Sequence, residues 1–135
     1  MRFETKIAVV LAGDLETWQK LNVTAFLASG VATTAEVIGE PYEDADGTPY
    51  LPLFRQPVMV FAGGAAVLSA VHAKAVDRRL PTAVFTRDMF ATGHDAANRE
   101  VVAKVARADL DLVGVAVHGP RNAVDKMLKG AVLHP

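Results

Sequence analysis

The segment Arg87–Asp95, with the sequence RDMFATGHD, places several side chains that can do chemistry on nine consecutive residues. Asp88 could orient or deprotonate a water molecule, and Thr92 could donate a hydrogen bond to a developing oxyanion. A purely structural interpretation fits the same residue types. Asp88 would then pair with Arg87 or bond to loop amides, and Asp95 would cap the following helix. The segment is therefore a candidate site, and both interpretations remain open.

Lys20 and two histidines could complete a site at this segment. Lys20 is one of the few charges on a mostly apolar stretch, so its ammonium either holds an anionic group or extends to water. Imidazole and carboxylate groups are adequate ligands for zinc or manganese. The side chains of this kind near the expected strand ends are His94, His118, Asp14, Asp88 and Asp95. Their spacing matches no HxH, HxxxH or HExxH pattern, so we expect no metal.

The composition is that of one globular domain spanning residues 1–135. Hydrophobic residues make up 51% and charged residues 21%, which excludes a disordered chain. The formal net charge is −1, whereas a domain that binds nucleic-acid backbones usually carries a basic excess. The chain has no cysteine, so disulfides, cysteine-bound metals and a thiol nucleophile are excluded. Gly63-Gly64 fits neither nucleotide-binding glycine motif, and we expect no cofactor.

We expect a cytoplasmic protein that does not enter a membrane. The first apolar run, Ile7–Ala12, is too short for a secretory signal. The longest uncharged stretch, Gln56–Ala73, is interrupted by Pro57 and by Gly63-Gly64. Two separate elements explain this stretch better than one membrane-spanning helix.

Short apolar runs rich in β-branched residues alternate with helical patterns along the chain, which predicts an α/β fold. The predicted strands are 6–12, 58–61, 82–86 and 112–117, with a further short strand over 130–133. The predicted helices are 15–28, 65–79, 96–107 and 121–129. Asp14 is the expected N-cap of the first helix. That helix is apolar over most of its surface, with Leu15, Trp18 and Phe26 on one stripe, and should be largely buried.

These elements predict a three-layer α/β/α arrangement around a mixed, mainly parallel sheet of four or slightly more strands. In such sheets ligands bind at the carboxyl ends of the strands. We therefore expect four side chains at or near these ends to bind the substrate: Asp14, Arg87, His94 and His118. Residues 40–52 interrupt the alternation, and their Asp46-Gly47 pair predicts an exposed hairpin-like excursion.

The order of several motifs resembles that of the type II peptidyl-tRNA hydrolases. The first is the strand 6–11 followed by Asp14-Leu15 and a helix rich in small residues. The second is the helix from Val67, the Leu80-Pro81 turn, and a strand that ends in Arg87-Asp88. The third is the segment 113–120, with its His-Gly-Pro turn and following helix. The resemblance implies that family's fold and hydrolysis of an ester bond.

By position, the resemblance assigns catalytic roles to Asp88 and Thr92, and more loosely to Lys20. The sequence also departs from the family pattern. Ala25 stands where the enzymes carry a glutamine, and the lysine- and glycine-rich start of the first helix is replaced by residues 16–21. The basic character needed to hold tRNA phosphates is mostly absent. The chain therefore resembles an uncharacterised bacterial branch of that superfamily.

Two functions follow from these observations. The first is a hydrolase of an acyl ester, either peptidyl-tRNA or a smaller acylated substrate. Asp88 would orient the water, Thr92 would stabilise the oxyanion, and Lys20 would hold an anionic group of the substrate. The alternative is a non-catalytic domain, expected to be a homodimer, that has lost this chemistry and binds a small ligand or a protein.

Overall fold

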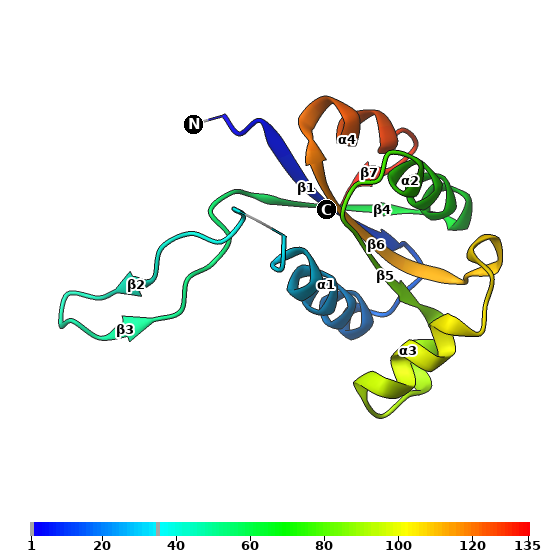
Figure 1. Cartoon of the computed structure of the whole chain (residues 1–135), viewed down its shortest axis with the longest axis horizontal. Coiled ribbons are helices and arrows are strands. Elements are labelled where there is room, and N and C mark those ends of the chain that lie inside the picture. The colour runs from blue at the N-terminus through cyan, green and yellow to red at the C-terminus, as the bar shows by residue number, and fades with distance from the viewer. Residues whose placement is uncertain (1, 35) are drawn as a thin grey trace.

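The computed structural model describes residues 2–34 and 36–135 and contains one central sheet of five strands. The strands lie side by side in the order β5-β6-β1-β4-β7 (Figure 1). Their bounds are β1 Thr5–Ala12, β4 Val58–Gly63, β5 Thr82–Thr86, β6 Leu112–Pro120 and β7 Val132–Leu133. The five predicted strands are therefore present. β1 is central, and its residues 7–12 are all buried.

The sheet is mixed, but it is not mainly parallel as predicted. Only β1 and β4 pair in parallel, with Val9 opposite Val60. β6 runs antiparallel to both β1 and β5, and β7 runs antiparallel to β4. An apolar run does not encode a strand direction, and alternation of strands with helices is only a general indication of parallel pairing. The reversal of β6 matters for function because it places the carboxyl end of β6 at the opposite edge of the sheet.

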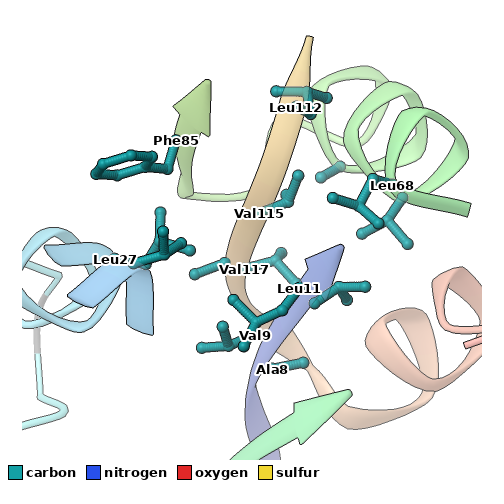
Figure 2. Packing of buried hydrophobic residues seen from close by; sticks show 14 of the residues in the cluster. Ala8, Val9, Leu11, Leu27, Leu68, Phe85, Leu112, Val115 and Val117 are labelled. Carbon is teal, nitrogen blue, oxygen red and sulfur yellow. The ribbon is translucent and has the colours of Figure 1, made fainter. Parts of the chain in front are cut away.

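Helices cover both faces of the sheet, which gives the predicted three layers (Figure 1). The helices are α1 Thr17–Val31, α2 Ala65–Asp77, α3 Asp95–Ala103 and α4 Arg121–Met127, with short 3-10 helices at Arg87–Ala91 (η1) and Arg107–Asp109 (η2). Figure 2 shows Leu27 of α1 and Leu68 of α2 on opposite sides of β6. Within the described residues, no helix is long and apolar enough to cross a membrane.

The buried stripe of α1 differs from the predicted one. Val23, Leu27 and Val31 face the sheet and are buried, whereas Trp18 and Phe26 are more than half exposed. Both stripes have helical spacing, so periodicity alone could not choose between them. The N-cap is Glu16, which forms a capping box with Gln19, and is not Asp14.

Residues 36–55 form a protruding hairpin, called the arm below (Figure 1). Within it, β2 (Tyr42–Glu43) pairs antiparallel with β3 (Pro49–Tyr50), in the segment where the sequence predicts a hairpin-like excursion over 40–52. Asp44 closes the turn by accepting hydrogen bonds from the Tyr50 hydroxyl (2.7 Å) and from backbone amides, including that of Thr48. These bonds stabilise the carboxylate and hold the pKa of Asp44 below its usual value.

Gly114 of β6 allows α1 to lie close against the sheet. A Cβ atom at this position would lie 2.5 Å from Val23 Cγ1 and 2.9 Å from Leu27 Cδ1, which is well inside van der Waals contact. Both neighbours are buried side chains of α1 and have little room to move. A larger residue at 114 would push α1 away from β6.

Gly114→Ala should therefore destabilise the protein by about 1–3 kcal/mol, the usual cost of overpacking a core. Urea unfolding followed by circular dichroism measures the change. Gly13→Ala is the matched control, because a Cβ atom at Gly13 meets no atom within 4 Å. Its effect should stay within about 0.5 kcal/mol. Equal effects of the two substitutions would show that contact at Gly114 does not control the packing of α1.

Candidate functional site

The carboxyl ends of β1, β4 and β5 lie at the same edge of the sheet. The sequence predicted this position for the turns at Gly13-Asp14 and Gly63-Gly64 and for Arg87-Asp88. The Gly13 amide donates a hydrogen bond of 3.1 Å to the Gly63 carbonyl oxygen and joins two of these turns. Asp14 lies at this edge and is exposed. His118 does not belong to this group. It pairs with Ile7 near the start of β1, at the opposite edge, where its Nδ1 lies 3.2 Å from Thr34 Oγ1.

The three residues assigned to catalysis point to different surroundings. Lys20 Nζ lies 3.2 Å from Nε2 of His134, which follows β7 at the far side of the sheet from β5. Asp88 is exposed on η1. The Thr92 hydroxyl donates a hydrogen bond of 2.9 Å to the Met89 carbonyl oxygen and also contacts the Asn98 side chain. Its single proton is therefore used inside the protein, and no shared space joins the three groups.

The remaining charged and ring groups of Arg87–Asp95 also have local partners. Arg87 pairs with Asp111 through Nε and Oδ2 at 3.1 Å, and not with Asp88 as the structural interpretation proposed. Nδ1 of His94 accepts a hydrogen bond of 3.2 Å from the Ala97 amide, so His94 caps α3 in place of the expected Asp95. Asp95 forms an ion pair with Arg99 one turn along α3. The part of the chain that the structure describes contains no cluster of three potential metal ligands.

A cleft of about 590 Å³ lies between α1, β5 and α3, next to this segment. Its apolar lining includes Phe26 and Leu27 from α1, Phe85 from β5 and Val102 from α3. Phe85 is buried, whereas Phe26 is half exposed. No residue of α3, as the structure describes it, is fully buried. The helices α1 and α3 and the strand β5 therefore border a cleft that is open to solvent and mainly apolar.

Aromatic rings continue the cleft toward the carboxyl edge of the sheet. Ring centroids are 5.8 Å apart between Phe26 and Phe85, 5.1 Å between Phe85 and Phe90, and 6.0 Å between Phe90 and Trp18. A second hollow of about 320 Å³ lies beside these rings and shares Phe26 and Phe85 with the first. Such rings offer large, rigid apolar surface to a ligand.

Polar side chains from α3 and α1 border the apolar lining. Asn98 lines both hollows, as does Asp95 with its ion-pair partner Arg99 beside it. Asn98 uses one of the two polar groups of its amide to contact Thr92, so the other remains for a ligand. The Ser29 hydroxyl is committed to the Phe26 carbonyl oxygen at 2.6 Å. The cleft can thus hold the apolar part of a ligand, while Asn98 or Arg99 binds one polar group of the same ligand.

Most residues of this cleft were not among the predicted site residues. Of the predicted site residues, only His94 and Thr92 border the second hollow. Phe26, Phe85, Asn98 and Val102 were missed because aromatic and aliphatic residues at helix and strand spacing predict a core. The available signal was the concentration of aromatic residues at Trp18, Phe26, Phe85 and Phe90 in a chain with only 7% aromatics.

The sheet, its helices on both faces and the open apolar cleft define an α/β protein with a ligand-sized hollow at one side. The chain belongs to the DUF2000 family, described as a protein family of unknown function, which it matches over residues 5–135. It is also similar to a solved structure of a protein of unknown function from Agrobacterium tumefaciens strain C58. The two chains are 49% identical, the match covers 99% of this chain and 100% of that one, and the TM-score is 0.94. A comparison with curated proteins finds no match.

These matches do not support the resemblance to type II peptidyl-tRNA hydrolases. They place the chain in a family of unknown function, and the similar structure is also described as a protein of unknown function. Fold similarity does not by itself transfer an activity. The function must therefore be argued from the cleft and the residues around it.

Two histidines should make stability depend on pH. Burial lowers the pKa of His118, and burial together with the nearby Arg107 lowers the pKa of His72. The unfolded chain, with imidazole pKa values of about 6.5, then binds protons more readily than the folded protein. The free energy of unfolding should therefore be highest above about pH 7 and fall as the pH decreases toward about 5.5. Urea unfolding across this range measures the trend, which should weaken in His72→Gln/His118→Gln; an unchanged slope would exclude these two groups as its cause.

Proposed function

We propose that this protein is a non-catalytic domain that binds a small, mainly apolar ligand in the cleft between α1, β5 and α3. The observation that carries the proposal is the cleft itself, of about 590 Å³ and lined by Phe26, Phe85 and Val102. Pockets for small molecules have volumes of about 300–1,000 Å³ and combine apolar walls with a few polar groups. The cleft meets both criteria.

The lining indicates the class of ligand. Phe26 and Phe85 contact each other at an interplanar angle of 68°, and the half-exposed ring of Phe26 leaves apolar surface available. A planar or branched apolar group would bury this surface at a gain of about 25 cal/mol per Å². Asn98 would bind a carbonyl or hydroxyl group of the ligand, and the exposed guanidinium of Arg99 would favour a carboxylate. We therefore infer a small amphipathic molecule with one hydrogen-bonding or anionic end.

Hydrolysis of an acyl ester has weaker support. That chemistry needs a base, an oxyanion donor and a substrate-holding group around one reacting carbonyl. Asp88 is exposed, the Thr92 hydroxyl donates a hydrogen bond to the Met89 carbonyl oxygen, and Lys20 contacts His134, which follows β7. The three groups would have to move toward one another before any ester could react between them. Binding without catalysis requires no such movement.

Filling the cleft should weaken the binding of an apolar probe. The fluorescent probe anilinonaphthalene sulfonate combines a flat apolar body with an anionic group, so it matches the inferred ligand class. We expect it to bind the wild-type protein, and we expect Ala103→Phe to weaken binding at least about tenfold, because Ala103 lines the cleft. A loss of this size corresponds to about 1.4 kcal/mol. Fluorescence titration measures it.

Ala96→Phe is the matched control. Ala96 is an exposed alanine of the same helix and does not line the cleft. Probe binding should be unchanged in this variant, and both variants should unfold at the temperature of the wild type. Equal loss in the two variants, or no loss in Ala103→Phe, would place the binding site elsewhere.

The enzymatic alternative makes a separate prediction. Purified protein incubated with N-blocked aminoacyl-tRNA should release no more free tRNA than a buffer control, because Asp88, Thr92 and Lys20 do not converge. The Asp88→Asn variant should behave identically. Release by the wild type that Asp88→Asn lowers tenfold or more would instead establish a hydrolase with Asp88 in its chemistry.

A further inference from the structure

The arm carries several apolar side chains that are exposed to solvent. Leu51 is 84% exposed and Leu53 is 61% exposed, and Ile38, Tyr42 and Tyr50 are also exposed. The β2–β3 ladder joins only two residue pairs, with one further bridge between Ile38 and Phe54. A two-stranded hairpin of this kind is marginally stable in water unless it packs against another surface. Exposed apolar residues concentrated on one protruding segment mark an interaction surface.

The same chain has an apolar face on the α1 side of the sheet that is only partly covered. α1 packs against β6, β5 and β1 and leaves β4 without comparable cover among the described residues. Leu11 lies on the α1 side, because a Cβ atom at Gly114 would meet Leu11 Cδ2 at 3.6 Å together with Val23 and Leu27 of α1. Side chains alternate along a strand, so the register places Val58, Val60 and Ala62 of β4 on this same side.

This open face extends from α1 to the edge strand β7. Val132 pairs with Ala62 and therefore also lies on the α1 side, and it is 68% exposed. Leu21, on the flank of α1 away from Phe26, is equally exposed. β4 is only partly buried along its whole length, whereas the neighbouring residues of β1 are fully buried. We define the open face as Leu21, Val58, Val60, Val132 and the adjoining Lys20.

The arm is acidic, and the open face carries one basic side chain, Lys20. Lys20 contacts the His134 ring, and within the described residues it has no carboxylate partner. The arm carries one basic residue, Arg55, and five acidic ones: Glu36, Glu40, Glu43, Asp44 and Asp46.

We propose that the arm of one copy packs on the open face of a second copy, and that the second arm packs reciprocally on the first copy. One polypeptide supplies both surfaces, so a two-fold axis satisfies both arms at once, as in most homodimers. The apolar side chains of each arm cover Leu21, Val60 and Val132 of the partner, and its carboxylates lie near the partner's Lys20.

The area available suffices for a stable dimer. Aromatic side chains bury about 150–250 Å² each, and a half-exposed tyrosine retains about half of that for an interface. Two such tyrosines and three exposed aliphatic residues provide roughly 500 Å² per arm. Each arm covers a similar area of its partner, so two arms bury roughly 2,000 Å². Stable specific interfaces bury about 1,200–2,000 Å².

The oligomeric state of surface variants tests the proposal. Sedimentation equilibrium should find the wild type dimeric, and it should find both Leu51→Asp/Leu53→Asp and Leu21→Asp monomeric. All three leucines are exposed, so circular dichroism should show both variants folded. Leu133→Asp is the matched control: Leu133 is also exposed, but it pairs with Phe61 and points to the α2 side. Its dimer should persist.

A monomeric wild type would overturn the proposal, and so would a dimer that survives either acidic variant or is lost in Leu133→Asp. Because the chain has no cysteine, a crosslink gives a second readout. A tagged Leu51→Cys copy mixed with an untagged Leu21→Cys copy should yield a mixed covalent dimer with a bismaleimide, identified by its mass. Leu51→Cys mixed with Leu133→Cys should not. Failure of the first pair to crosslink, or equal crosslinking of both, would refute packing of the arm on the open face.

Discussion

The close contact between α1 and β6 at Gly114 sets the geometry of both the cleft and the open face. Because Gly114 has no side chain, Val23 and Leu27 lie directly against β6, and α1 is centred over β6 and β5. One flank of α1 then brings Phe26 to Phe85 and forms a wall of the cleft. The other flank carries the exposed Leu21 and does not reach over β4, so the open face remains beside it. A single close approach of helix to sheet thus leaves an apolar hollow on one side and an apolar face on the other.

The kinds of elements and their order could be predicted from the sequence, but the strand directions could not. The runs around Val9, Val60, Val84 and Val115 are apolar and β-branched, which favours buried strands in either orientation. The direction of β6 depends on its connection from β5. That connection includes α3 and η2 and returns the chain to the edge at which β5 ends. Segment lengths alone do not reveal this return, so His118 was expected at the wrong edge of the sheet.

The candidate site was harder to predict than the fold, because its residues have the composition of a core. On α1, the stripe with Trp18 and Phe26 and the stripe with Val23 and Leu27 both have helical spacing. The choice between them is made by Gly114 on a distant strand, which accepts compact aliphatic side chains. In the Arg87–Asp95 segment, polar residues with chemical potential serve the local structure instead, as His94 does by capping α3. Residue type indicates which chemistry a side chain can perform. Its hydrogen-bond and ion-pair partners in the folded protein determine whether it is available for that chemistry.

The cleft and the open face share α1, and this bears on whether ligand binding and association influence each other. Coupling between two sites requires an element with two arrangements that both sites can bias. α1 would have to rotate or shift to serve as that element. Its buried side chains meet β6 with no free space at Gly114, so a shift in either direction would create a clash or a cavity. The physical constraint that creates both surfaces therefore also separates them, and we expect the ligand affinity of the cleft to be independent of dimerisation through the arm.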